Sequence, residues 1–447
     1  MTDNTRRPSG QRPNGTRSTT GRTTANGRTG AARGNGQAHT RGAAGNGGRT
    51  EAHRAGMQGD GVVRRRPSGT SGHSNSEKRA KEKKRRRNLL ILEIGLLVIL
   101  LIVLLIYLKV SAVVETDSDF DDSEIKEAIN EQVSEETLET LKGYRNIALF
   151  GVDDRKNGEY ANRSDSIMIA SINNDTGEVK IVSVYRDTYL DVGGGRYNKC
   201  NAAYSEGGPE QSIAMLNRNL DLNITDYVAV DFYALVSAID AVGGIDLDIT
   251  DEEALIMNYH TGNPDDVGYI DEIVSIVKGK NEDPSAYYVN SGHIHANGVQ
   301  ATAYCRIRYT AGDDFKRASR QREVLSKLVE KAKQANISEI NKLINSMYGN
   351  VRTSLSLAEM LSMAGSMKDY TLADTTGFPF YKTTGTYGGS SLVVPCTLES
   401  NVVELYKYLF NDTAYVPSTT IVDHSDYIIN YTGCDESSAQ DYQSFDY

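Results

Sequence analysis

Arginine is concentrated in residues 303–322 of this 447-residue chain, which read AYCRIRYTAGDDFKRASRQR. Tyr304, Arg306 and Arg308 alternate with apolar residues, and this alternation predicts a β-strand that carries the three side chains on one face. Guanidiniums this close repel one another unless an anion lies between them, and Arg binds phosphate through paired hydrogen bonds. The stretch therefore predicts half of a phosphate or pyrophosphate site, with a solvated basic face as the alternative.

A helix is expected directly after this strand. Arg317, Arg320 and Gln321 follow at the spacing of one helical face. Asp313 or Asp314 stands where an N-cap belongs, and a helix N-terminus adds partial positive charge. We therefore expect the strand and the helix to aim several guanidiniums at one anion.

Three predicted strand ends between residues 146 and 187 supply a second set of charged side chains. Asp153 follows the first strand and Asp165 begins the second, at positions where α/β proteins place ligands. Carboxylates mixed with arginines fit a Mg²⁺ ion that bridges them to phosphate oxygens. The cationic candidates here are Arg155, Arg163, Arg186 and Lys199. Ordinary salt bridges at loop tips are the alternative interpretation.

The elements that must position these residues have the pattern of an α/β domain that begins near Arg145. Short β-rich runs are expected at 146–152, 166–172 and 179–184, with a hairpin at NNDTG between the last two. The further expected elements are helices at 211–220 and 232–242, strands at 227–231 and 244–249, short helices within 251–290, a mostly helical 317–370, strands near 377–381 and 391–395, and a helix at 398–409.

Charge divides the chain into two parts, although the net charge is only −10. Residues 1–87 are strongly basic, rich in Gly, Arg, Thr and Ser, and too poor in large apolar residues to fold, so we expect a disordered cytoplasmic tail. A nucleic-acid-binding tail is the alternative, but no aromatic residue precedes Tyr107 to stack on bases. We therefore expect attraction to anionic lipid and no nucleic-acid partner.

A membrane anchor is expected at 88–110, because residues 89–108 are apolar except for Glu93. The basic block at 78–87 predicts a cytoplasmic N-terminus and an extracellular C-terminal domain, in a single-pass protein of the cell membrane. A cleavable signal peptide is the alternative, but the 87 preceding residues argue against it. Residues 111–143 predict a stalk helix that packs on the domain or on a second copy of itself.

The four cysteines are expected outside the cytoplasm by this topology, where disulfides form. They include no CxxC pair, which argues against a zinc site. Cys200 and Cys305 flank the candidate phosphate ligands, whereas Cys396 and Cys434 lie in the C-terminal region. We expect the pairs Cys200–Cys305 and Cys396–Cys434.

Six segments between about 146 and 325 form one ordered set: FGVDDR, NRSDSIMI, SVYRDT, KCNAAYSEGG, VDFYALVSAIDAVGGIDLDI and NGVQATAYCRIRYTAGDDFKRASRQR. Together they resemble the LytR-CpsA-Psr proteins of Gram-positive cell envelopes. The resemblance implies a three-layer α/β/α domain with a central mixed sheet. It implies a phosphotransferase that moves a glycopolymer, such as teichoic acid or capsule, from an undecaprenyl pyrophosphate carrier to peptidoglycan as a phosphodiester.

The resemblance also implies roles for the charged residues. Asp153 and Asp165 would hold Mg²⁺. The pyrophosphate would contact Arg163, Arg186, Arg306, Arg308 and Arg317, with Lys199, Asp314 and Gln321 around them. Either Asp313 or Asp314 would be the functional aspartate, and a carboxylate such as Asp165 or Asp314 would be the candidate base. The isoprenoid tail would lie between sheet and helices, with 211–220 and 232–242 as walls.

The expected organisation is a basic tail (1–87), a membrane helix (88–110), a stalk (111–143), the catalytic domain (144–325), a C-terminal part of helices and strands (326–425) and an acidic disordered tail (426–447). Two other functions remain open. One is a hydrolase that uses the same arginines with water as acceptor. The other is a non-catalytic sensor or regulator that binds lipid intermediates outside the cell.

Overall fold

The computed structural model describes Lys84 and residues 115–116, 120, 123–129, 133–153, 163–259, 266–308, 310, 312–336, 338–339, 342–343 and 350–442. The predicted membrane helix at 88–110, and the predicted cytoplasmic tail apart from Lys84, lie outside these residues. Within the described part of the chain, no helix has both the length and the apolar character needed to cross a bilayer.

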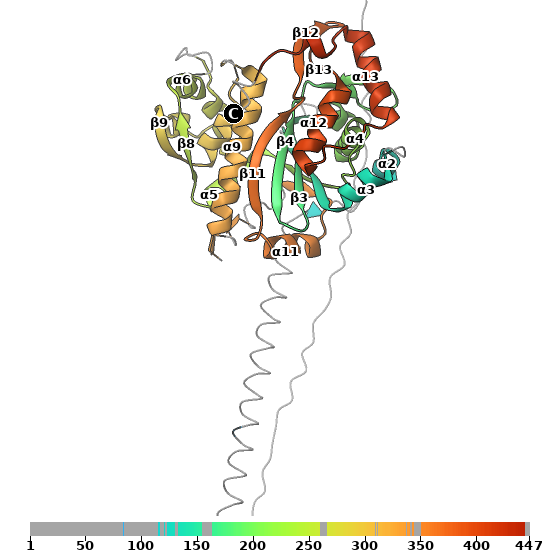
Figure 1. The fold of residues 1–447 in the computed structure, drawn as a ribbon. Helices are drawn as coiled ribbons and strands as arrows, with labels where there is room; N and C mark the ends of the chain where they lie inside the picture. The colour runs from blue at the N-terminus through green and yellow to red at the C-terminus, as the bar shows by residue number, and fades with distance from the viewer. Residues whose placement is uncertain are drawn as a thin grey trace, which may run out of the picture. The chain divides into compact units, whose positions relative to one another are not determined.

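A seven-stranded sheet lies at the centre of the folded region (Figure 1). Its strands, in spatial order, are β1 (Glu115–Thr116), β10 (Val351–Thr353), β7 (Asp226–Val230), β2 (Tyr144–Val152), β3 (Ser164–Asn173), β4 (Glu178–Val184) and β11 (Thr371–Phe378). β2, β3 and β4 pair antiparallel, whereas β7 and β11 run parallel to β2 and β4 respectively. The predicted mixed sheet is therefore confirmed, as is the hairpin between β3 and β4.

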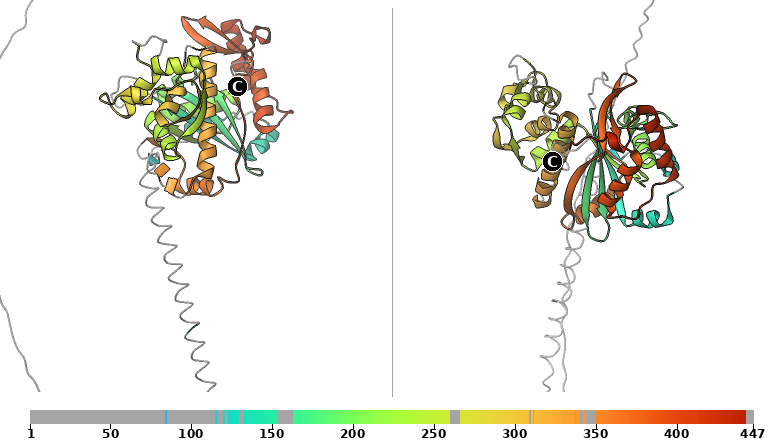
Figure 2. Two further views of the ribbon diagram at one scale, coloured as in Figure 1. Left: turned by 90° about the vertical axis from the view of Figure 1, so that its left-hand side faces the viewer. Right: turned by 45° about the horizontal axis from the view of Figure 1, so that its top comes forward.

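Helices cover both faces of the sheet (Figures 1 and 2). One face packs against α2 (Ser123–Glu127), α3 (Glu135–Lys142), α4 (Ala202–Leu220), α12 (Leu398–Phe410) and α13 (Thr419–Thr432). The other side carries α5 (Phe232–Ala241), α6 (Asp251–Tyr259), α7 (Tyr269–Val277), α8 (Gly298–Tyr304) and α9 (Asp313–Gln334). The remaining elements are α11 (Leu357–Gly365), two 3₁₀ turns (Pro284–Tyr287 and Glu436–Ser438), and the hairpins β5 (Tyr189–Asp191) with β6 (Tyr197–Lys199), β8 (Ile245–Ile249) with β9 (Gly292–Ala296), and β12 (Lys382–Tyr387) with β13 (Ser390–Pro395).

The two-residue period of the strands separates the core from the site. On β2, Ala148 and Phe150 point into the main hydrophobic core under α4 and α12. Leu149 and Gly151 point to the opposite face, where they line a pocket under α5, α8 and α9. A second hydrophobic core holds α5 to α9 together with β8 and β9, so the pocket lies between the sheet and an independently packed group of helices.

The single stalk helix expected at 111–143 is wrong for the residues that the structure describes, but this segment does pack on the domain, one of the two placements expected for it. Two short helices, α2 and α3, stand there instead and pack on the domain. Ile125 and Leu141 are fully buried in the main core, and Ser134 caps α3 by accepting from Thr137 N–H. Burying these apolar side chains against α4 and the sheet stabilises the packed form over an exposed helix.

The strand predicted at Tyr304 to Arg308 is also wrong. Helix α8 continues to Tyr304, and Arg306 and Arg308 lie in the irregular segment after it. Asn297 and Gln300 form a reciprocal capping box at the start of α8. That local signal outweighs the alternation of polar and apolar residues that suggested a strand.

The C-terminal segment is ordered where disorder was expected at 426–447. Ser418 caps α13, and the buried residues Ile421, Ser425 and Ile428 recur at helical spacing along it. Gln440 then forms an antiparallel bridge with Lys382, the first residue of β12. The described C-terminal residues therefore belong to the folded domain; residues 443–447 lie outside the described part.

The expected disulfides are wrong, because all four cysteines are buried free thiols. Cys200 belongs to the main core and Cys305 to the second core, on opposite sides of the sheet. Cys396 and Cys434 share the main core without a bond between them. Burial raises the pKa of Cys305 to about 12 and that of Cys200 further, so both thiols stay protonated.

Candidate functional site

A pocket of about 400 Å³ opens between the sheet and the helices α5, α7, α8 and α9. Its floor comes from residues of three strands, among them Leu149, Met168 and Val228. The walls add apolar side chains from the helices, including Leu235 and Val324. The charged residues that line the pocket are Asp153, Asp165, Arg186, Asp231, Glu272, Arg306, Arg308 and Arg317. An apolar interior therefore adjoins a strongly polar region within one pocket.

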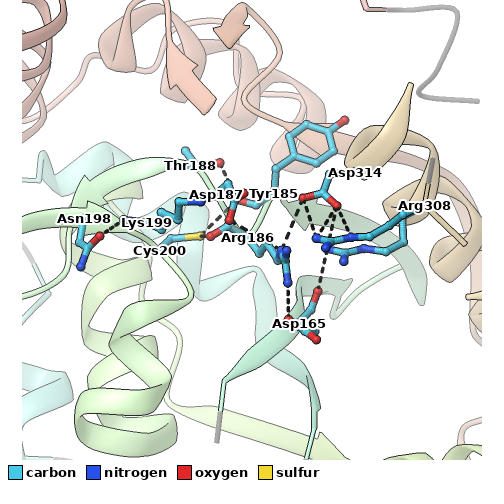
Figure 3. A network of polar contacts seen from close by, with 11 residues as sticks. Asp165, Tyr185, Arg186, Asp187, Thr188, Asn198, Lys199, Cys200, Arg308 and Asp314 are labelled. Atoms are coloured by element: carbon cyan, nitrogen blue, oxygen red, sulfur yellow. Dashed lines mark hydrogen bonds and ion pairs between the residues drawn. The ribbon is translucent and has the colours of Figure 1, made fainter. Parts of the chain in front are cut away.

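Arg186 lies on a turn whose backbone carbonyl groups accept several hydrogen bonds (Figure 3). Tyr185 C=O accepts from Thr188 N–H at 2.9 Å and from the Cys200 thiol at 3.2 Å. The same thiol lies 3.3 Å from Arg186 C=O, and Asp187 C=O accepts from Val393 N–H at 2.9 Å. These bonds fix the direction in which the Arg186 side chain leaves the end of β4.

The first turn of α9 brings a carboxylate to this arginine. Gly312, with φ +89°, caps the helix, a conformation that suits glycine. Neither predicted aspartate is therefore the N-cap. Asp313 is exposed, whereas Asp314 is half-buried at the site, so of the two aspartates it is Asp314 that lies among the arginines. Three guanidiniums lie within 3.4 Å of its oxygens, those of Arg186, Arg308 and Arg317.

Asp165 completes the network from β3. Its carboxylate accepts from Arg186 at 2.6 Å, and its backbone C=O accepts from Arg317 at 3.4 Å. Burial opposes the charge on Arg186, but Asp165 and Asp314 raise the pKa of its guanidinium above the ordinary value. Burial lowers the pKa of Arg317, and its Nε has no hydrogen-bond partner among the described residues. A desolvated, incompletely bonded guanidinium at the pocket wall is suited to receive an anion.

Arg306 reaches the same pocket from the other side. Its guanidinium forms a 2.9 Å ion pair with Glu272 of α7 and lies 4.8 Å from the ring centroid of Phe232. Its Nη1 is buried without a hydrogen-bond partner in the described part of the chain. Glu272 therefore neutralises Arg306 without using all of its donors.

The pocket lining is electrically balanced, with four arginines and four carboxylates. A diphosphate would bring net negative charge, so the arginines alone do not compensate it once their own carboxylates are counted. No group of three His, Cys, Asp or Glu within the described residues could hold a metal by itself. Mg²⁺, however, binds through one or two carboxylates and completes its shell with water and phosphate oxygens. Asp153 and Asp165 fit that requirement.

The structure brings together most of the predicted site residues but not all. Gln321 lines the pocket, and its side chain donates to Cys305 C=O at 3.3 Å. Lys199 pairs with Asp187 at 3.1 Å, beside the Arg186 turn. Arg163 is exposed and lies outside the pocket lining. Arg155 lies outside the described residues. Of the predicted helix face, Arg320 points away and forms a buried pair with Glu253 at 2.8 Å.

Sequence reasoning missed three residues that shape the pocket: Asp231, Phe232 and Glu272. Asp231 caps α5 by accepting from Ala234 N–H, a recognisable capping signal that also places Phe232 at the pocket. Of the two helices expected as walls of the isoprenoid groove, α5 lines this pocket. Helix 211–220 does not, because α4 packs in the main core on the opposite face. No sequence motif around Glu272 indicates a site residue, because only the packing of α7 brings it to Arg306.

The fold and the site define a class of α/β proteins in which a cluster of arginines adjoins the apolar interior of one pocket. The LytR_cpsA_psr family model matches residues 106–391, and the chain belongs to this family. The expected family is thereby confirmed.

Curated relatives support this assignment. The chain is 28% identical over 283 residues to the polyisoprenyl-teichoic acid–peptidoglycan teichoic acid transferase TagV of Bacillus subtilis, covering 62% of this chain and 66% of the relative. It is 30% identical over 226 residues to the transferase TagU of Bacillus cereus, covering 50% and 64%. The matched region thus spans about two thirds of the length of these relatives.

Among solved structures, protein gbs0355 from Streptococcus agalactiae is similar with a TM-score of 0.51 and 23% identity, over 66% of this chain and 97% of that protein. This likeness supports the fold.

Proposed function

We propose that the protein is a membrane-anchored extracytoplasmic phosphotransferase that moves a glycopolymer from an undecaprenyl pyrophosphate carrier to peptidoglycan. The observation that carries the proposal is the pocket itself, in which Arg186, Arg306, Arg308 and Arg317 adjoin an apolar interior. A polyprenyl diphosphate has the same division between an anionic head and an apolar chain. The similarity to TagV and TagU, whose names describe teichoic acid transfer, favours teichoic acid among the candidate polymers.

The reaction joins the acceptor oxygen to the phosphorus that carries the glycan. The acceptor is the peptidoglycan muramic-acid 6-hydroxyl. The bond between that phosphorus and the bridging oxygen breaks, and polyprenyl monophosphate leaves with the electron pair. The hydroxyl proton passes to a base or to the leaving phosphate. Negative charge shifts onto the bridging oxygen, so fixed positive groups at that oxygen lower the barrier.

The arginines that line the pocket provide such positive groups. Arg186 and Arg317 approach from two different elements and share the carboxylate of Asp314, which holds them apart and oriented before substrate enters. Arg308 reaches the same carboxylate from the segment after α8. An incoming diphosphate would take over part of these contacts. Because the guanidiniums are already placed, little reorganisation is needed at the moment of reaction.

Mg²⁺ is the proposed cofactor: Asp153 and Asp165 would hold it, and it would neutralise charge that the arginines leave uncompensated. The apolar residues of the floor and walls would bind the first isoprene units of the carrier. The proposed location follows from the sequence alone: an anchor at 88–110, the basic tail in the cytoplasm and the catalytic domain outside.

The experiment is a transfer assay with the full chain in detergent, a polyprenyl-pyrophosphate-linked oligosaccharide, Mg²⁺ and peptidoglycan, read by mass spectrometry. Transfer predicts oligosaccharide phosphate bound to peptidoglycan, together with polyprenyl monophosphate. Oligosaccharide phosphate released into solution, regardless of peptidoglycan, would identify a hydrolase. Tight binding without turnover would support a lipid-sensing protein and reject the enzyme.

A further inference from the structure

Lys382 is a buried lysine enclosed by aromatic rings. Lys382 is the first residue of β12, in the folded C-terminal part, and is only 2% exposed. Its Nζ lies 5.1 Å from the ring centroids of both Tyr185 and Phe315, and 5.6 Å from that of Tyr442. All three distances lie within the range of a cation–π interaction, which strengthens when the cation is desolvated. The three rings therefore attract one ammonium from three directions.

Two of these rings belong to residues next to Arg186 and its carboxylate partner Asp314. Tyr185 directly precedes Arg186, and Phe315 directly follows Asp314. The two rings meet edge to face, with their centroids 4.7 Å apart. Across the same junction, Arg186 Nε lies 3.4 Å from Asp314 Oδ2. The turn after β4 and the first turn of α9 thus meet twice, by an ion pair on the pocket side and by rings on the Lys382 side.

The backbone also makes room for this arrangement. Gly377 of β11 faces the ring of Tyr185, and any side chain there would overlap it. Tyr185 N–H donates to Phe378 C=O at 3.0 Å, which anchors the ring against the edge of the sheet. Strand β11 therefore fixes the position of the Tyr185 ring. Phe315 and Lys382 pack against this fixed ring.

The C-terminal segment encloses Lys382 on the remaining side. Gln440 N–H donates to Lys382 C=O at 2.9 Å, and Tyr442 packs on Phe315 with ring centroids 4.7 Å apart. The hydroxyl of Tyr442 also lies 3.1 Å from Thr384 Oγ1 on β12. Residues far from the pocket in sequence thus contact Lys382 and Phe315, behind Arg186 and Asp314.

We propose that Lys382, enclosed by Tyr185, Phe315 and Tyr442, is a positioning residue that sets the spacing between Arg186 and Asp314. The proposal rests on the proposed function, because that spacing matters for transfer only if Arg186, which Asp314 orients, binds the diphosphate. Lys382 does not touch substrate. Its ammonium holds the two rings together, and the rings hold the two backbone turns from which Arg186 and Asp314 extend.

The test compares Lys382→Met and Lys382→Arg with the wild-type full chain in detergent. Methionine keeps the length and apolar stem but removes the charge, whereas arginine keeps a cation that can face the same rings. Lys407→Met is the matched control, because Lys407 is an exposed lysine that pairs with Glu404 on α12. Each protein is assayed for melting temperature, for inorganic pyrophosphate binding with Mg²⁺, and for kcat and KM in the transfer reaction.

We expect Lys382→Met to weaken pyrophosphate binding about tenfold and to lower kcat/KM by roughly tenfold to hundredfold, because small displacements of positioning groups have effects of this size. These losses should persist well below its melting temperature. Lys382→Arg should recover most of the pyrophosphate affinity and most of kcat/KM, and Lys407→Met should match the wild type. A Lys382→Met protein that loses only thermal stability, with unchanged binding and turnover, would overturn the proposal.

If Lys382→Met fails to fold, Tyr442→Leu decides, because it removes one ring near the end of the chain. Weaker pyrophosphate binding in this variant supports the proposal, and wild-type binding overturns it. A wild-type chain that binds no pyrophosphate overturns the proposed function and this inference together. A wild-type chain that binds and transfers, beside an equally active Lys382→Met, overturns the inference alone.

Discussion

Arg186 and Asp314 meet with 3.4 Å between Nε and Oδ2, although one lies in the turn after β4 and the other in the first turn of α9. The contact joins two motifs that are far apart in the sequence, SVYRDT and TAGDDFKR. It also defines the geometry on which the proposed catalysis depends, because Arg308 and Arg317 reach the same carboxylate.

Asp314 should matter far more than its neighbour Asp313. Asp314→Asn removes the shared counter-ion of three guanidiniums, which then repel one another and lose their orientation. We expect kcat/KM in the transfer assay to fall by roughly tenfold to hundredfold. Asp313→Asn alters an exposed side chain and should stay within about twofold of wild type. Equal losses in the two variants would contradict the assignment of Asp314.

Removing the charge of Glu272 should strengthen anion binding. Glu272 pairs with Arg306 at 2.9 Å inside the pocket, so its charge opposes that of an incoming diphosphate. Glu272→Gln should raise the affinity for inorganic pyrophosphate by about tenfold, the effect of one unit charge nearby at intermediate dielectric. Titration calorimetry measures it, with the exposed Glu252→Gln as control. Weaker binding in Glu272→Gln would mean that Glu272 chiefly orients Arg306.

Removing Mg²⁺ should weaken the binding of pyrophosphate to the pocket. With EDTA, we expect the affinity for pyrophosphate to fall by at least about tenfold, because the lining arginines are already balanced by carboxylates. Asp165→Asn should raise the Mg²⁺ concentration needed for half-maximal binding, and Asp153→Asn should do the same. Asp175→Asn, in the exposed β3–β4 turn, is the control. Metal-independent binding in the wild type would refute the role of Mg²⁺.

The β8–β9 hairpin predicts a pH-dependent contribution to stability. His295 Nδ1 lies 2.6 Å from Asp246 Oδ1, and its Nε2 lies 2.7 Å from Gly243 C=O. Both nitrogens thus face acceptors. The Asp246 hydrogen bond and the carbonyl raise the pKa of His295 above its ordinary 6.5, although Lys331 of α9 opposes this. The hydrogen bond from His295 lowers the pKa of Asp246 below 3.8.

The sign follows from these directions. The contribution of His295 is fully present below pH 6.5 and is lost as the pH rises through its raised folded pKa. That of Asp246 is present above pH 3.8 and is lost as the pH falls through its lowered folded pKa. His295→Gln should therefore lower the melting temperature more at pH 5.5 than at pH 9, by calorimetry. In an Asp246→Asn background this pH dependence should shrink. An equal effect at both pH values would contradict it.

The sequence predicted most of the sheet but misplaced the segment that carries two site arginines. The runs at β2, β3 and β4 are apolar, β-branched and separated by clear turns, so local pattern and tertiary structure agree. At Tyr304 to Arg308, alternation suggested a strand while the Asn297–Gln300 capping box began a helix. Helix α13 was missed because its buried positions are few and include Ser425 among tyrosines and acidic residues.

The charged residues of the candidate site could be predicted where they lie within a recognisable sequence motif. Asp165, Arg186, Arg308 and Arg317 were identified and do meet. Glu272 and Lys382 could not be found, because their importance comes from long-range packing of α7 and of β12 against the C-terminal segment. Arg320 was assigned wrongly because helical spacing cannot distinguish a side chain at the site from one that pairs with Glu253 in the core.

The most direct test of the central claim measures diphosphate binding at the arginines. ³¹P NMR would follow geranyl pyrophosphate with Mg²⁺ as the full chain in detergent is added. Arg186→Gln and Arg317→Gln would be compared with the wild type, and Arg196→Gln, an exposed arginine paired with Glu206, would be the control. We predict that both diphosphate resonances shift and broaden with the wild type and the control, and that saturation needs about a hundredfold more of either site variant. Identical titrations for all four proteins would contradict the account.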